Sequence, residues 1–121
     1  DSLLQITNDQ TFVAREVALG RMTPEEALVS PQRNILLQCV GVTATVSPDF
    51  FCGEFESETS FMICSDGFRH LVSPQEILNE FRPHSLSDEN DMRRRIRSLI
   101  ELNKIRMEAD NITALLVKAA D

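Results

Sequence analysis

Two apolar stretches, each joined to a carboxylate, constrain the fold of this chain most strongly. Residues 61–64 are four consecutive apolar residues, and after one serine they lead into Asp66 and Gly67. Near the other end of the chain, Asp110 precedes the apolar, β-forming residues 112–117. Unbroken apolar runs of this length are typical of strands that are buried on both faces. We therefore predict two central strands, one ending at a carboxylate and the other beginning after one.

The order of these elements predicts where the two carboxylates lie. If the two strands are antiparallel neighbours, Asp66 and Asp110 reach the same edge of the sheet, because adjacent strands are only about 4.8 Å apart. Paired carboxylates suit a hard divalent cation such as Mg²⁺ or Mn²⁺. Each aspartate also has a simpler interpretation, since Asp-Gly is common in hairpin turns and Asp-Asn is common in loops. Local sequence alone leaves these alternatives open.

Capping signals predict three of the helices. Residues 7–10 have the Thr-x-x-Gln pattern of a capping box and precede a helix that reaches Leu19. Thr-Pro-Glu-Glu at 23–26 predicts a short second helix, because cap, proline and glutamate all occupy favoured positions. Ser-Pro-Gln-Glu at 73–76 repeats this signature and predicts a helix over residues 74–82.

The remaining periodicity completes the predicted architecture. Apolar residues recur at helical spacing over 88–107, which predicts the longest helix, with residues 84–90 as an exposed loop before its apolar stripe. Residues 34–46 and 50–55 are rich in β-formers and predict further strands. With helices grouped apart from strands, the sequence predicts an α+β fold with a mainly antiparallel sheet. A length of 121 residues suits one domain.

Charge and composition exclude several classes of protein. Twelve Lys and Arg against 19 Asp and Glu give a net charge of -7, which argues against a nucleic-acid partner. We expect no membrane partner either, since no apolar run is long enough to span a bilayer. Three cysteines without Cys-x-x-Cys spacing favour reduced thiols and a cytoplasmic location. The basic run 93–97 is interpreted as a solvated helix face, and neither His70 nor His84 has the partners of a catalytic base.

Five segments, in order and at matching spacing, resemble the C-terminal half of the bacterial type 2C, metal-dependent serine/threonine protein phosphatases. The two most specific are Cys-Ser-Asp-Gly-Phe and Asp-Asn-Ile-Thr, which are similar to the Ser-Asp-Gly and Asp-Asn-Ile-Thr motifs of that family. The five segments are residues 4–10, 20–27, 31–36, 64–68 and 110–113.

This resemblance implies a fold, a cofactor and a chemistry. The fold is an α-β-β-α sandwich, with two metal ions, Mn²⁺ or Mg²⁺, at the mouth between the sheets. The activity is hydrolysis of phosphoserine or phosphothreonine in protein substrates of signalling pathways. By motif position, Asp66 and Asp110 are implied metal ligands, and Asn111 and Gly67 are implied to support them. The resemblance implies no other catalytic residue within this chain.

The resemblance also leaves part of the site outside the chain. The Asp-Gly-x-Gly-Gly element and the phosphate-binding arginine of the family do not occur in it, and it begins on Asp1 instead of Met. We therefore expect residues 1–121 to be the C-terminal portion of a single phosphatase-like domain and to be inactive alone. The alternative is an inactive phosphatase-like module that regulates or binds a partner through residues 31–41. Apolar strands left without neighbours also predict self-association.

Overall fold

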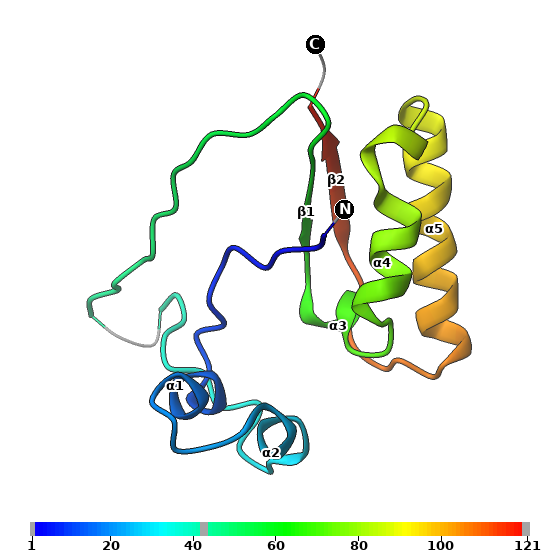
Figure 1. Cartoon of the computed structure of the whole chain (residues 1–121). Helices are drawn as coiled ribbons and strands as arrows, with labels where there is room; N and C mark the ends of the chain where they lie inside the picture. Colours follow the sequence, from blue (N-terminus) through cyan, green and yellow to red (C-terminus); the bar gives the residue numbers. More distant parts are fainter. Residues whose placement is uncertain (1, 42–43, 120–121) are drawn as a thin grey trace. The chain divides into compact units, whose positions relative to one another are not determined.

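The computed structural model describes residues 2–41 and 44–119, which divide into two compact units (Figure 1). One unit is Leu4–Gly53, and the other combines Asp1–Leu3 with Glu54–Asp121. The assignment of residues 1–121 to one domain stays a prediction.

Helix α1 opens the first unit and spans Phe12–Ala18. Its N-cap is Thr11, whose hydroxyl accepts a hydrogen bond from the backbone N–H of Ala14 at 3.2 Å. The predicted cap at Thr7 is wrong, because Thr11 is held in extended conformation by an isolated antiparallel bridge to Leu36. The backbone becomes helical only after that bridge.

Helix α2, Pro24–Val29, confirms the second capping prediction. Thr23 Oγ accepts from the N–H of Glu26 at 3.2 Å, and Glu26 Oε2 accepts from the N–H of Thr23 at 2.8 Å. The helix ends before Pro31, because the residue that precedes a proline is disfavoured in helical conformation.

The strands predicted over 34–46 and 50–55 are wrong for the described residues of these ranges. Apart from the Leu36 bridge they contain no strand, and Val42 and Thr43 lie outside the described part. A strand exists only through its ladder partners, so β-forming composition without a partner leaves the chain irregular. The apolar side chains stay exposed, with Val40 98% and Phe50 86% accessible.

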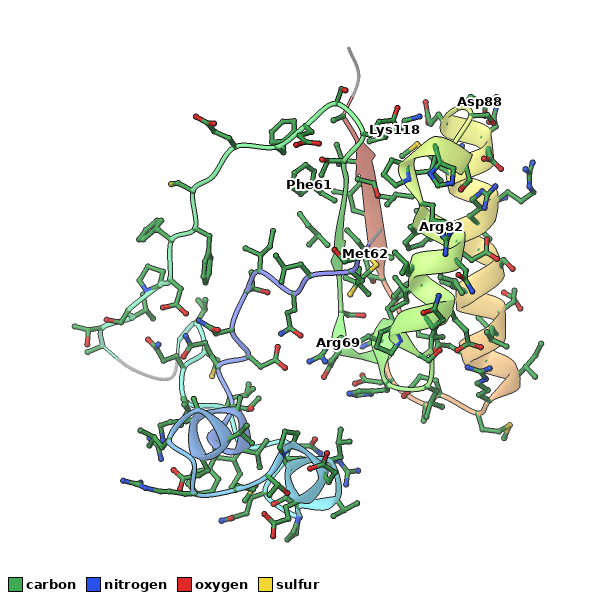
Figure 2. The ribbon with its side chains drawn as sticks, viewed as in Figure 1. Phe61, Met62, Arg69, Arg82, Asp88 and Lys118 are labelled. Atoms are coloured by element: carbon green, nitrogen blue, oxygen red, sulfur yellow. The ribbon has the colours of Figure 1, made fainter. Side chains whose placement is uncertain are left out.

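The second unit contains a two-stranded antiparallel sheet of β1, Ser60–Cys64, and β2, Ala114–Lys118. The register pairs Ser60 with Lys118 and Cys64 with Ala114, which confirms the predicted antiparallel neighbours. Burial on both faces is wrong, however, because Ile63 remains 69% exposed on the outer face. In Figure 2 the side chains of Phe61 and Met62 lie on opposite sides of β1.

Within the described residues of this unit, the helices cover one face of the sheet, its inner face. The short α3, Asp66–Arg69, follows β1, and α4, Pro74–Phe81, and α5, Glu89–Ile105, lie side by side against the strands (Figure 1). The predictions of both long helices are confirmed. Helix α4 ends at Phe81 because Arg82 precedes Pro83, and the 3-10 turn η1, Pro83–Ser85, follows.

The core lies between the helices and the inner face of the sheet. Phe68, Phe81, Leu86, Leu99 and Leu116 are all at most 8% exposed. The burial of Leu86 shows that the predicted exposed loop before α5 is wrong at this residue, which follows η1 and packs into the core.

Ion pairs account for most of the basic residues of α5. Arg93 pairs with Glu89, while Arg94 and Arg95 both pair with the buried Asp91. The interpretation of this run as a solvated helix face fits the exposed Arg93 and Arg94. It is wrong at Arg95, whose side chain is 24% exposed and donates to the carbonyls of Glu80 and Ser85. No helix of the described residues has both the length and the apolar character needed to cross a bilayer.

The C-terminal end of α5 is tied to the N-terminal end of α4. Arg106 contacts both carboxylate oxygens of Glu76, at 2.6 and 2.9 Å, and donates to the carbonyl of Leu71 at 2.6 Å. The hydrogen bonds from Arg106, and then those from Ser73, lower the pKa of Glu76 from 4.5 to about 2. Glu76 therefore remains ionised at neutral and at mildly acidic pH.

Candidate metal-binding edge of the sheet

Asp66 is the first residue of α3, directly beyond the end of β1. Ser65 is the N-cap of this short helix, and the alternative interpretation of Asp66-Gly67 as a plain hairpin turn is therefore wrong. The side chain of Asp66 is 63% exposed, and its Oδ1 accepts from the backbone N–H of Gly67 at 3.0 Å. This hydrogen bond constrains one carboxylate oxygen and leaves the side chain at the surface.

Asp110 lies in the loop between α5 and β2, and a buried glutamate organises that loop. The side chain of Glu108 is 9% exposed, and its Oε1 accepts from the backbone N–H groups of Ala109 and Asp110 at 3.0 and 2.9 Å. Asp110 Oδ1 in turn accepts from the N–H of Asn111 at 2.7 Å. The exposed Asp110 carboxylate therefore belongs to a loop whose backbone is fixed by hydrogen bonds to the Glu108 side chain.

The two aspartate-bearing segments are in direct contact. Ser65 donates its N–H to the carbonyl of Thr113 at 2.9 Å, and its Oγ contacts both Asn111 O and Thr113 N, at 2.9 and 3.0 Å. A Cβ on Gly67 would lie 3.1 Å from the Cβ of Asp110. The absence of a side chain at Gly67 lets the loop approach this closely.

The histidine at the C-cap of α3 lies close to both segments. His70 Nε2 lies 3.9 Å from Asp66 Oδ2, and its Nδ1 lies 3.5 Å from Glu108 Oε2. Neither residue was predicted for this site, because His70 lacks the partners of a catalytic base in the sequence and Glu108 lies in none of the sequence motifs. The spacing of four residues between Asp66 and His70 places both on one helix face, and this was the available signal.

The chemistry of this edge fits part of a hard-cation site. Asp66 and Asp110 offer exposed carboxylate oxygens, the ligands that Mg²⁺ and Mn²⁺ prefer. Within residues 2–41 and 44–119, no group of three or more His, Cys, Asp or Glu is placed to hold a metal ion. The described donors thus amount to a partial set, and the roles of both aspartates as metal ligands stay a prediction.

Comparison with known proteins relates the whole of the chain to one kind of phosphatase. It is 32% identical over 119 residues to the serine/threonine phosphatase stp of Listeria welshimeri, covering 98% of this chain and 45% of the relative. It is 34% identical over 112 residues to a putative protein phosphatase 2C-type of Streptococcus pyogenes, covering 93% and 44%. No family model matches the sequence.

Solved structures agree with these sequence matches. The serine/threonine phosphatase Stp1 of Staphylococcus aureus superposes with a TM-score of 0.81 at 31% identity, covering 98% of this chain and 44% of that one. PstP/Ppp of Mycobacterium tuberculosis gives a TM-score of 0.82 at 31% identity, covering 99% and 48%. The chain thus spans somewhat less than half the length of the proteins it matches. It belongs to the type 2C family of bacterial serine/threonine phosphatases and corresponds to the C-terminal half of their α+β fold.

Proposed function

We propose that this chain supplies two metal ligands, Asp66 and Asp110, to the two-metal site of a protein phosphatase that hydrolyses phosphoserine and phosphothreonine. The observation that carries the proposal is the close approach of Gly67 to the Asp110–Asn111 loop. It brings the backbone that bears one carboxylate against the backbone that bears the other. Membership in the type 2C family supports the substrate class.

Each proposed ligand is oriented by the residue that follows it. The N–H of Gly67 holds one oxygen of Asp66, and the N–H of Asn111 holds one oxygen of Asp110. Asn111 thus contacts its aspartate through the main chain, and the supporting roles of Asn111 and Gly67 are part of this proposal. Such supporting contacts fix the direction in which a ligand presents its oxygens. Bound Mn²⁺ or Mg²⁺ would supply an activated water and neutralise charge on the transferring phosphoryl group.

The 121-residue chain alone is proposed to be inactive. Mg²⁺ demands near-octahedral coordination and gives up its water reluctantly, so two carboxylates are too few to hold a binuclear centre. Purified chain with Mn²⁺ or Mg²⁺ should therefore hydrolyse a chromogenic phosphate ester no faster than the metal ion alone. Hydrolysis above this blank would contradict the proposal that the chain contributes only part of the site.

The proposed ligand roles are tested by neutralising each carboxylate in a protein that contains both this chain and the missing half of the domain. Asp66→Asn and Asp110→Asn should each reduce hydrolysis of a phosphothreonine peptide by at least about 100-fold, the upper range for loss of a metal-site contact. Asp88→Asn is the matched control, since it makes the same charge change at the N-cap of α5, where asparagine also caps well.

Two outcomes of this experiment separate the candidate functions. Loss of turnover in both site variants, with the control unchanged, supports the phosphatase. A protein that is inactive before any substitution supports the alternative, a phosphatase-like regulatory module in a signalling pathway. A cytoplasmic location is part of the same proposal and is checked by cell fractionation.

We also propose that the isolated chain self-associates through the outer face of its sheet. This face combines Ile63, which is 69% exposed, with Leu115 and Val117, which are 55% and 48% exposed. Phe61 pairs with Val117 in the ladder, and Ile63 pairs with Leu115, so the four side chains form one continuous apolar surface. Burial of such a surface against a second copy removes it from water.

A further inference from the structure

Asn103 is a polar residue in the apolar stripe of α5. Its side chain is fully buried, at 0% exposure, and the neighbouring members of the stripe, Leu99 and Ile100, pack into the core. A buried amide costs free energy unless its donors and acceptors find partners. The hydrogen-bond partners of the Asn103 side chain therefore indicate why a polar residue occupies this position.

The contacts of Asn103 reach both aspartate-bearing segments. Its side-chain Nδ2 donates to the carbonyl of Phe68 at 2.8 Å, two residues after Asp66. Its main-chain carbonyl accepts from the N–H of Glu108 at 3.0 Å, two residues before Asp110. A single residue thus holds the end of α3 and the beginning of the Asp110 loop.

The second contact belongs to a reversal of the chain at the end of α5. Met107 has a positive φ of 66°, and its N–H bonds to the carbonyl of Lys104, while the N–H of Glu108 bonds to Asn103. These two hydrogen bonds form a Schellman motif, which turns the chain sharply out of the helix. The hydrogen bond from the N–H of Glu108 to the carbonyl of Asn103 therefore fixes the direction in which the loop leaves α5.

The amide of Asn103 is only partly satisfied by hydrogen bonds. Asn103 Nδ2 also donates to the carbonyl of Leu99 at 3.1 Å, but Oδ1 is buried without a hydrogen-bond partner among the described residues. A leucine of similar size would remove the orphaned Oδ1 and would suit the apolar stripe, but it would leave the carbonyl of the fully buried Phe68 without this donor. What leucine cannot do is donate a hydrogen bond to Phe68. A residue that breaks the local pattern in this way is expected at a functional site.

We propose that Asn103 is a positioning residue that fixes the spacing between the Asp66 and Asp110 segments. It touches neither carboxylate and acts through the backbone on each side. The assignment rests on the proposed function, in which the two carboxylates serve one metal site. A substitution that removes the side-chain donor then lets α3 and the Asp110 loop move independently.

The test follows backbone amide resonances of the ¹⁵N-labelled 121-residue chain by NMR. Without metal, nuclear Overhauser contacts between Gly67 and Asp110 report the spacing directly. On titration with Mn²⁺, paramagnetic broadening of the Gly67 and Asn111 amides should share one midpoint. In Asn103→Leu the metal-free contacts should be lost, and the midpoint should rise about tenfold, the lower range for loss of an outer contact of a metal site.

Ile96→Val is the matched control, because Ile96 lies on the same buried face two turns earlier and packs into the same core. It should lower the melting temperature and leave both the contacts and the midpoint unchanged. Unchanged contacts and an unchanged midpoint in Asn103→Leu would overturn the proposal. If Asn103→Leu does not fold, hydrogen exchange of the unaltered chain tests the proposal instead. Its Asn103 side-chain amide protons should exchange with solvent as slowly as core amides, and rapid exchange would overturn the assignment.

Failure of the proposed function gives a different result. If Mn²⁺ broadens neither amide in the unaltered chain, or if Asp66→Asn and Asp110→Asn leave the broadening unchanged, the metal role of the aspartates is wrong. The metal-free contacts between Gly67 and Asp110 still decide whether Asn103 positions the two segments.

Discussion

The Cβ that Gly67 lacks would lie 2.6 Å from the carbonyl oxygen of Asn111. Side-chain carbons do not approach a backbone oxygen this closely, so one of the two segments must move if a methyl group is added. The glycine is needed here for close approach and not for an unusual φ. It couples the start of α3 to the loop that bears Asp110.

Gly67→Ala should therefore destabilise the protein and displace the Asp110 loop. Inserting a methyl group into a packed contact typically costs about 1–3 kcal/mol, measurable by urea denaturation. Gly53→Ala is the control, since an added Cβ there meets nothing within 4 Å. Equal stabilities for both variants would contradict the prediction, because they would show that the Asp110 loop moves aside without a cost in free energy.

The stability of the protein should depend on pH through Glu76. Its pKa is lowered from 4.5 to about 2 by Arg106 and Ser73. A depressed carboxylate pKa stabilises the folded state fully above the unfolded value, and this contribution is lost as pH falls from 4.5 through about 2. The advantage of the wild type over Glu76→Gln in urea denaturation should thus shrink between pH 5 and roughly pH 2.

Glu101→Gln is the control for this pH dependence, because Glu101 forms a local surface pair with Lys104. It should leave the pH dependence nearly unchanged. A constant difference between the wild type and Glu76→Gln at all pH values would contradict the assignment. The pKa of Asp91 is also lowered, by the N–H of Ser87 and then by Arg95, so the wild type keeps some dependence in the same direction.

Met107→Gly should stabilise the protein. Met107 is 84% exposed and has a φ of 66°, a conformation in which glycine is preferred at the end of a helix. Relief of the left-handed strain exceeds the flexibility that glycine adds to the unfolded chain, for a net gain of about 0.5–1 kcal/mol.

Ser98→Gly is the matched control for Met107→Gly, because Ser98 lies inside α5, where glycine is less favourable than serine by about 0.5 kcal/mol. Thermal unfolding should give melting temperatures that shift in opposite directions for the two variants. Destabilisation by both would show that the methionine side chain contributes packing that its exposure does not reveal.

Self-association is predicted to depend on the outer face of the sheet. Ile63→Thr and Leu115→Thr change two cross-strand neighbours to threonine, a polar residue whose β-branched shape suits a strand. The wild-type chain should sediment as a dimer or larger species at micromolar concentration, and the double variant should sediment as a monomer. Salt of about 0.15 M screens repulsion between copies that each carry a net charge of -7. A monomeric wild type would contradict the prediction.

The sequence predicted elements best where the signal is local. The capping boxes at Thr23 and Ser73 are formed as expected, because all their hydrogen bonds lie within four residues. The two strands of the second unit were found because their apolar runs are short and bounded by polar turns. Over 34–46 the same β-forming composition produced only the Leu36 bridge in the described residues, since pairing depends on a partner strand that composition does not specify.

The candidate site was predicted in outline only. The order of elements predicted Asp66 and Asp110 at the same end of the two strands. The residues that join the two segments, however, do so by hydrogen bonds between a side chain and a backbone group. Ser65 bonds across to Thr113, and Asn103 bonds to Phe68 over 35 residues of sequence. Contacts between residues so far apart in the chain follow no characteristic sequence spacing, so they can be identified only once the fold is known.

The central claim is that Asp66 and Asp110 together bind metal, and anomalous scattering from Mn²⁺ tests it most directly. Crystals of the complete domain should be grown with Mn²⁺, and data collected above and below the manganese absorption edge. The account predicts anomalous peaks at coordination distance, about 2.0–2.2 Å, from carboxylate oxygens of both residues. Carboxylates more than about 10 Å apart, beyond the reach of cations bound side by side, or no anomalous peak beside either one, would contradict it.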